Sequence, residues 1–161
     1  MTKVFDVVVK SNGVESHYNN KAQAILAIIT DLSQREDFVE LTKAEFEGIR
    51  KSLKLLRDSE KAITVKNEHM EFKAALVNQK RDRNLNKQAT GYVFSTDLPK
   101  TFRLDHNIAK ADLLFEVLDI YSEMNEFTSD IRAELLEDFK VLLYEKEPYI
   151  PGCGMITEVE I

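Results

Sequence analysis

Three histidines and one cysteine are the side chains of this sequence best suited to bind a metal ion or to attack a substrate. No two of His17, His69 and His106 have the spacing of a zinc-binding pair on one helix. His69 and Glu71 are two residues apart, so on a strand they would share one face and could supply two metal ligands. Because the spacing identifies no third ligand, we assign no metal ligand and no cofactor.

Cys153 lies between two glycines, in a segment that predicts a turn before a final strand. A cysteine nucleophile needs a neighbouring base and a lowered pKa, and no histidine is near Cys153 in the sequence. The adjacent carboxylates at 36–37 and 137–138 would diverge on a helix or a strand, unlike an acid–base pair. We therefore assign no catalytic residue. A small enzyme that combines a histidine with Cys153 or with a carboxylate is the second alternative function.

The charges of the chain are distributed unevenly. Residues 1–42 have a net charge of −2 and residues 43–103 a net charge of +6, whereas residues 104–161 hold four basic and fourteen acidic residues, a net charge of −10. A basic middle and an acidic end can attract different partners or face each other within the fold. Both can also be solvated faces of amphipathic helices.

Acidic residues recur every three or four positions in the last third of the chain, which places them along helix faces. Such an acidic helical face predicts docking on a protein partner with a basic surface, and it could imitate a nucleic acid. This predicts a non-enzymatic binding protein that modulates its partner, for example as an inhibitor. The residues assigned to this face are Asp112, Glu116, Asp119, Glu123, Glu134, Glu137 and Asp138.

A polar, basic stretch in the middle of the chain is the basis of the first alternative, a nucleic-acid-associated protein. Basic side chains in an exposed loop can contact phosphates, and aromatic side chains can stack on bases of a single strand. The low pI of about 5.2 argues against this function. The candidate phosphate contacts are Lys80, Arg81, Arg83 and Lys87, and the aromatic residues on the hairpin that follows are Tyr92, Phe94 and Phe102.

The elements that would position these residues can be read from periodicity and turn signals. Residues 3–18 predict a hairpin with its turn at Asn12 and Gly13, because both residues tolerate positive φ. Asn19 or Asn20 can cap a helix, and Thr42 with Glu45 fits a capping box that opens a second helix. Residues 61–79 alternate as two strands would, although a helix over 68–77 is an alternative.

The sequence after residue 91 predicts a hairpin over 92–104. Two helices should follow, one capped by Asn107 and the other by Thr128 or Ser129, and then a final strand over 155–161. Paired neighbouring strands with segregated helices indicate an α+β fold. We expect an antiparallel sheet with about four helices packed on it, in a single domain spanning residues 1–161. A chain of 161 residues with 43% hydrophobic residues can form such a domain.

The sequence shows no signal peptide and no stretch apolar enough to span a membrane, and its one cysteine cannot form an intrachain disulfide. We therefore expect a cytoplasmic protein. The lack of tryptophan, the few glycines and the abundance of lysine, asparagine and glutamate are typical of small accessory proteins such as phage-encoded modulators, for which the location would be the host cytoplasm.

Overall fold

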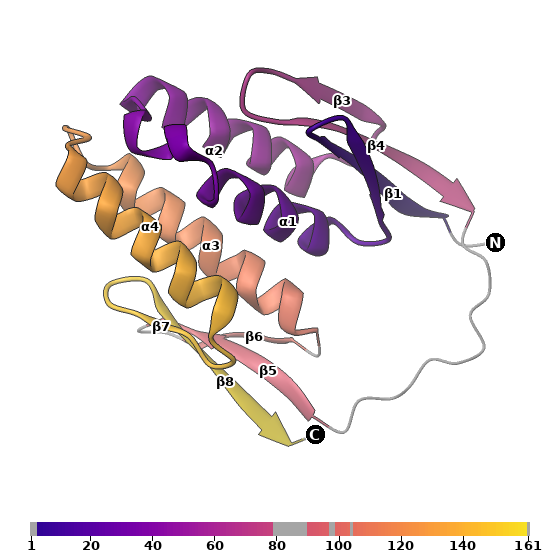
Figure 1. Cartoon of the computed structure of the whole chain (residues 1–161). Coiled ribbons are helices and arrows are strands. Elements are labelled where there is room, and N and C mark those ends of the chain that lie inside the picture. Colours follow the sequence, from indigo (N-terminus) through magenta and orange to yellow (C-terminus); the bar gives the residue numbers. More distant parts are fainter. Residues whose placement is uncertain (1–2, 79–89, 97–98, 104, 161) are drawn as a thin grey trace.

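A computed structural model describes residues 3–78, 90–96, 99–103 and 105–160 of the chain. The described part contains four α-helices and two antiparallel sheets, which confirms the predicted α+β fold. Figure 1 shows the helices lying between the two sheets, with α1 and α2 toward one sheet and α3 and α4 toward the other. The expected antiparallel sheet is present as two separate sheets, because strand alternation indicates that a segment is a strand but does not specify its partner.

The first sheet has the strand order β2-β1-β4-β3. Its strands are β1 (Lys3–Ser11), β2 (Val14–Tyr18), β3 (Ile63–Lys66) and β4 (Glu71–Asn78). Asn12 and Gly13 form the turn between β1 and β2 with φ of 53° and 79°, as predicted. Residues 61–79 contain the strands β3 and β4, so the alternative of a helix over 68–77 is wrong.

The first two helices begin at the predicted caps. Helix α1 (Lys21–Ser33) begins after Asn20, whose side chain accepts a hydrogen bond from the backbone of Gln23. A short 3-10 helix, η1 (Glu36–Glu40), then leads into α2 (Lys43–Asp58). Thr42 and Glu45 form the predicted capping box at the start of α2. These caps need only side chains within three residues of each other, so sequence alone could identify them.

Helix α3 (His106–Ser122) is the most enclosed of the four, because it packs against α1, α2, α4 and the second sheet. Its cap is Asp105, which accepts a hydrogen bond from the backbone of Asn107, so the prediction of Asn107 as the cap is wrong by two residues. Helix α4 (Ser129–Tyr144) begins after Thr128, as predicted. One hydrophobic cluster joins the layers, from Phe72 in the first sheet to Phe94 in the second.

The second sheet has the strand order β6-β5-β8-β7. It consists of β5 (Thr90–Ser95), β6 (Pro99–Arg103), β7 (Tyr149–Ile150) and β8 (Gly154–Glu160), and the two-residue strand β7 was not predicted. The tight turn from β7 to β8 brings residues 151–153 against the end of α3, where Gly152 lies beside Ile120. None of the helices in the described ranges is long and apolar enough to cross a membrane.

Candidate functional site

A groove lies between the C-terminal part of α3, the N-terminal half of α4 and the β7–β8 turn. Its volume is about 500 Å³. Ile120, Met124 and Ala133 give it an apolar lining, and Glu134 and Glu137 add two exposed carboxylates at its edge. We call this hollow the acidic groove. The carboxylates were predicted as part of the acidic face, whereas the groove beside them depends on how α3, α4 and the β7–β8 turn pack.

Tyr121 and Asp138 form a hydrogen-bonded pair inside the acidic groove. The Tyr121 hydroxyl donates to Asp138 Oδ2 at 2.7 Å, and the tyrosine side chain is almost completely buried. Burial raises the pKa of both groups, and the negative charges of Glu134 and Glu137 raise the pKa of Asp138 further, against the effect of the hydrogen bond. Asp138 therefore links α4 to α3, and it is less available to a partner than the sequence suggested.

Cys153 also lines the acidic groove, but its thiol is buried. Burial and the negative charges of Asp138 and Glu116 raise the pKa of this thiol to about 11. A nucleophilic cysteine requires the opposite shift, because the thiolate is the reactive form. The environment of Cys153 thus favours a role in packing beneath the β7–β8 turn.

Asp119 lies on another side of α3 and takes part in ion pairs with α2. Its Oδ1 atom is 2.7 Å from Arg50 Nη2 and 2.8 Å from Lys54 Nζ. Burial opposes ionisation of this carboxyl, but the hydrogen bonds from Lys54 and Arg50 outweigh that effect and hold its pKa below the ordinary value. In this part of the fold the basic middle segment faces the acidic end, which was one of the two arrangements that the charge distribution allowed.

The other predicted acidic residues do not form one continuous row. Asp112 is half-buried beside a second pocket of about 280 Å³, where the Arg57 guanidinium lies over the Phe115 ring at 4.3 Å. Glu116 is half-buried on α3, and Glu123 is exposed just beyond its end. The structure thus brings Glu134, Glu137 and Asp138 together at the acidic groove and places Asp112 and Asp119 elsewhere.

The predicted phosphate contacts Lys80, Arg81, Arg83 and Lys87 lie outside the described residues. Of the aromatic residues on the following hairpin, Phe94 is buried in the core and cannot stack on a base. Tyr92 stacks on the His106 ring, with 4.2 Å between the ring centroids. Phe94 and Tyr92 are therefore both engaged within the fold, and the side chain of Phe102 lies outside those described.

His69 precedes β4 in the β3–β4 turn, so the prediction that it shares a strand face with Glu71 is wrong. The carboxylates close to its ring are instead Glu45 and Glu68. Periodicity could not indicate this group, because Glu45 comes from a different element and approaches His69 only when α2 packs near the hairpin.

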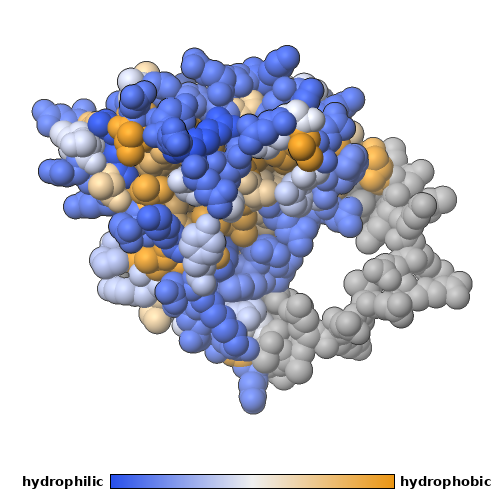
Figure 2. Space-filling view, in the orientation of Figure 1, coloured by the Kyte–Doolittle hydropathy of each residue, from blue (hydrophilic) through white to orange (hydrophobic). Residues whose placement is uncertain are grey.

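Comparisons of this chain with protein-family models, with curated proteins and with solved structures found no match. Function must therefore be argued from the side chains and their arrangement. The described face in Figure 2 is predominantly hydrophilic, with smaller hydrophobic areas between charged side chains. Such a surface is usual for a folded domain, so the composition of the surface alone does not identify a binding face.

Proposed function

We propose that this protein is a non-enzymatic binding protein that docks a basic segment of a protein partner in the acidic groove. Occupying that segment would modulate the partner by competing with its other anionic ligands. The observation that carries the proposal is the combination of an apolar lining with two exposed carboxylates in one hollow of about 500 Å³. An amphipathic segment with apolar and basic side chains is complementary to both features.

The apolar part of the acidic groove supplies the area that a partner can bury. Ile120 lies in α3, Met124 lies just beyond the end of α3, and Ala133 lies in the first half of α4. Removing apolar surface from water is the main favourable contribution to most protein associations. A partner side chain between α3 and α4 would therefore provide affinity, while the carboxylates determine which partners approach.

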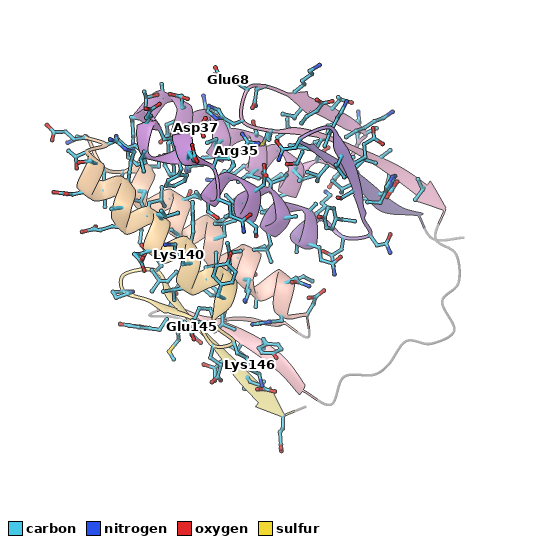
Figure 3. The ribbon with its side chains drawn as sticks, in the orientation of Figure 1. Arg35, Asp37, Glu68, Lys140, Glu145 and Lys146 are labelled. Carbon is cyan, nitrogen blue, oxygen red and sulfur yellow. The ribbon has the colours of Figure 1, made fainter. Side chains whose placement is uncertain are left out.

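The exposed carboxylates of the acidic groove favour the binding of cationic side chains. Glu134 and Glu137 are two exposed carboxylates at one groove, and after the larger effect of burial their negative charges also raise the pKa of the neighbouring Asp138. Lys140, labelled on α4 in Figure 3, lies 3.7 Å from Glu137, but both side chains are largely exposed, so this ion pair is weak. Complementary charge acts mainly on association rate and specificity.

The test replaces both exposed carboxylates, as Glu134→Gln with Glu137→Gln. A matched control replaces two exposed carboxylates far from the groove, as Glu15→Gln with Glu60→Gln, so both double variants change the net charge equally. The probe is an amphipathic peptide with leucine on one face and lysine on the other, and a second peptide has glutamate in place of lysine. We expect the lysine peptide alone to bind, with an affinity that falls as salt rises.

At low salt the groove variant should bind the lysine peptide about fivefold more weakly than the control variant, as is typical for the loss of two exposed charges. Fluorescence anisotropy measures both affinities, and circular dichroism verifies that both variants are folded. Equal binding by the two variants would refute the acidic groove as the docking site. Binding of an oligonucleotide instead of the lysine peptide would favour the nucleic-acid alternative.

A further inference from the structure

Three potential metal ligands converge where the β3–β4 turn meets the first turn of α2. They are one nitrogen of His69 and one carboxylate oxygen each from Glu45 and Glu68, and all three atoms lie within 4.8 Å of one another. Glu68 and His69 are adjacent in the turn, whereas Glu45 comes from the third position of α2. Figure 3 labels Glu68 at this turn. The group is remote from the acidic groove and does not depend on its function.

Local hydrogen bonds hold two of these residues in place. The side-chain oxygen of Asn67 accepts hydrogen bonds from the backbone of His69 at 2.9 Å and of Met70 at 3.0 Å, which fixes the turn. In the capping box, Glu45 Oε1 accepts hydrogen bonds from the backbone and hydroxyl of Thr42, at 3.4 and 3.0 Å. Because Oε1 is engaged there, Glu45 presents its other oxygen, Oε2, to His69 at 2.9 Å.

The Nε2 atom of His69 is buried, and Glu45 Oε2 lies 2.9 Å from it. Within the described residues this contact lacks the geometry of a well-directed hydrogen bond. Buried polar atoms usually have well-directed hydrogen bonds, so the bonding capacity of Nε2 is incompletely used by this contact. A cation shared by Nε2 and the carboxylate would satisfy both atoms.

There is space for such an ion and additional acidic residues around it. His69 and Glu45 line a cavity of about 120 Å³, to which η1 contributes Asp37 and Glu40. Asp37 is labelled in Figure 3 on the segment that leads into α2. Three carboxylates in the lining, from Asp37, Glu40 and Glu45, make the cavity attractive to a divalent cation, and the remaining coordination positions can be filled by water.

We propose that Glu45, Glu68 and His69 bind a divalent transition metal ion, with Zn²⁺ as the representative. Imidazole nitrogen is a good ligand for zinc, whereas calcium and magnesium prefer oxygen ligands alone. The ion joins the β3–β4 turn to the N-terminus of α2, so it stabilises the contact between these elements. The capping box acts as the outer support of the site, because it orients the Glu45 carboxylate.

The experiment is a calorimetric titration of the chelator-treated full-length protein with Zn²⁺. Wild type should bind one Zn²⁺ ion at this site and melt at a higher temperature when the ion is present, because a ligand that binds only the folded state stabilises it. Mg²⁺ and Ca²⁺ at the same concentration should cause no comparable shift. Wild type that binds no Zn²⁺, or binds Mg²⁺ equally well, would overturn the proposal.

Variants test whether the ion lies at the proposed residues. His69→Ala should abolish this binding event, and Glu68→Gln, at an exposed turn position, should weaken it at least about tenfold. The matched control is His17→Ala, because His17 is an exposed histidine on β2 and its loss should leave Zn²⁺ affinity unchanged. Substitution of Co²⁺ gives a visible absorption spectrum, which should change in Glu68→Gln. Equal Zn²⁺ affinities in wild type, Glu68→Gln and His69→Ala would refute the site.

Discussion

Carboxylates lie at two contacts of helix α3, and the neighbouring side chains determine what these carboxylates do. At the contact with α2, Asp119 of α3 meets Arg50 and Lys54, so its charge is balanced within the fold. At the contact with α4, Asp138 of α4 meets the hydroxyl of Tyr121 from α3 and the negative charges of Glu134 and Glu137. The α2–α3 contact thus uses acidic residues for internal pairing, whereas the acidic groove concentrates them beside an open hollow.

The pKa shifts express the same contrast with opposite signs. The pKa of Asp119 is lowered, so the folded state favours its ionised form, while the pKa of Asp138 is raised, so the folded state favours its protonated form. Acidic residues on helices can therefore stabilise or destabilise the protein at neutral pH. Packing against a basic or an acidic neighbour decides which effect occurs.

The largest effect on stability is expected at Gly154, the first residue of β8 after the turn that lines the acidic groove. Gly154 has a φ of +140°, and an added Cβ would collide with the Ser95 carbonyl oxygen and lie 3.1 Å from the Phe94 ring. We expect Gly154→Ala to lower the free energy of unfolding by about 3 kcal/mol. Urea denaturation measures this loss.

Gly48 in α2 is the matched control for Gly154→Ala, because a Cβ added there meets no atom within 4 Å. Gly48→Ala should raise the free energy of unfolding by up to about 1 kcal/mol, since alanine favours a helix over glycine. If Gly154→Ala proved as stable as wild type, the close packing of Gly154 against Phe94 and Ser95 of β5 would be wrong.

The second prediction concerns the ion pairs of Asp119 with Arg50 and Lys54. Asp119→Asn removes the carboxylate paired with Lys54 and one of the two paired with Arg50, which keeps Glu47 at 3.3 Å. We expect this change to cost about 1 kcal/mol at pH 7, a value reduced for the partial exposure of Asp119. The contribution of Asp119 is present above the pKa of the unfolded state and is lost as pH falls through the lower folded pKa. Stability of the variant should therefore fall less than that of wild type upon acidification.

Glu137→Gln serves as the comparison for Asp119→Asn, because Glu137 is exposed at the acidic groove. Its effect on stability at pH 7 should stay within about 0.5 kcal/mol. Urea denaturation at pH 7 and at pH 3 distinguishes the two sites. Similar losses of unfolding free energy in Asp119→Asn and Glu137→Gln would contradict the argued difference between the α2–α3 contact and the acidic groove.

The smallest effect is expected at Asp138. Its raised pKa means that the ionised form costs stability at neutral pH, and that this cost disappears as pH falls through the folded pKa. Asp138→Asn retains an acceptor for the Tyr121 hydroxyl and removes the charge, so we expect a gain of about 0.5 kcal/mol at pH 7. A clear loss of stability at pH 7 in thermal or urea unfolding would contradict the unfavourable burial of this charge.

Much of the local structure could be predicted because the relevant side chains are close in the sequence. The Asn12–Gly13 turn and the caps at Asn20, Thr42 and Thr128 each involve residues no more than a few positions apart. Such features arise from backbone sterics and short-range hydrogen bonds, which operate before any tertiary contact forms. The α+β class followed from the order of these elements.

Only the tertiary structure decided the roles of the charged residues and the division of the strands into two sheets. Asp119 pairs with Arg50 and Lys54, and His69 approaches Glu45, because helices and hairpins distant in the sequence pack side by side. A periodic pattern specifies which face of an element is apolar, but not which element will cover that face. The sequence therefore determined most of the elements and the caps at Asn20, Thr42 and Thr128, while packing determined which carboxylates are neutralised and which surround a groove.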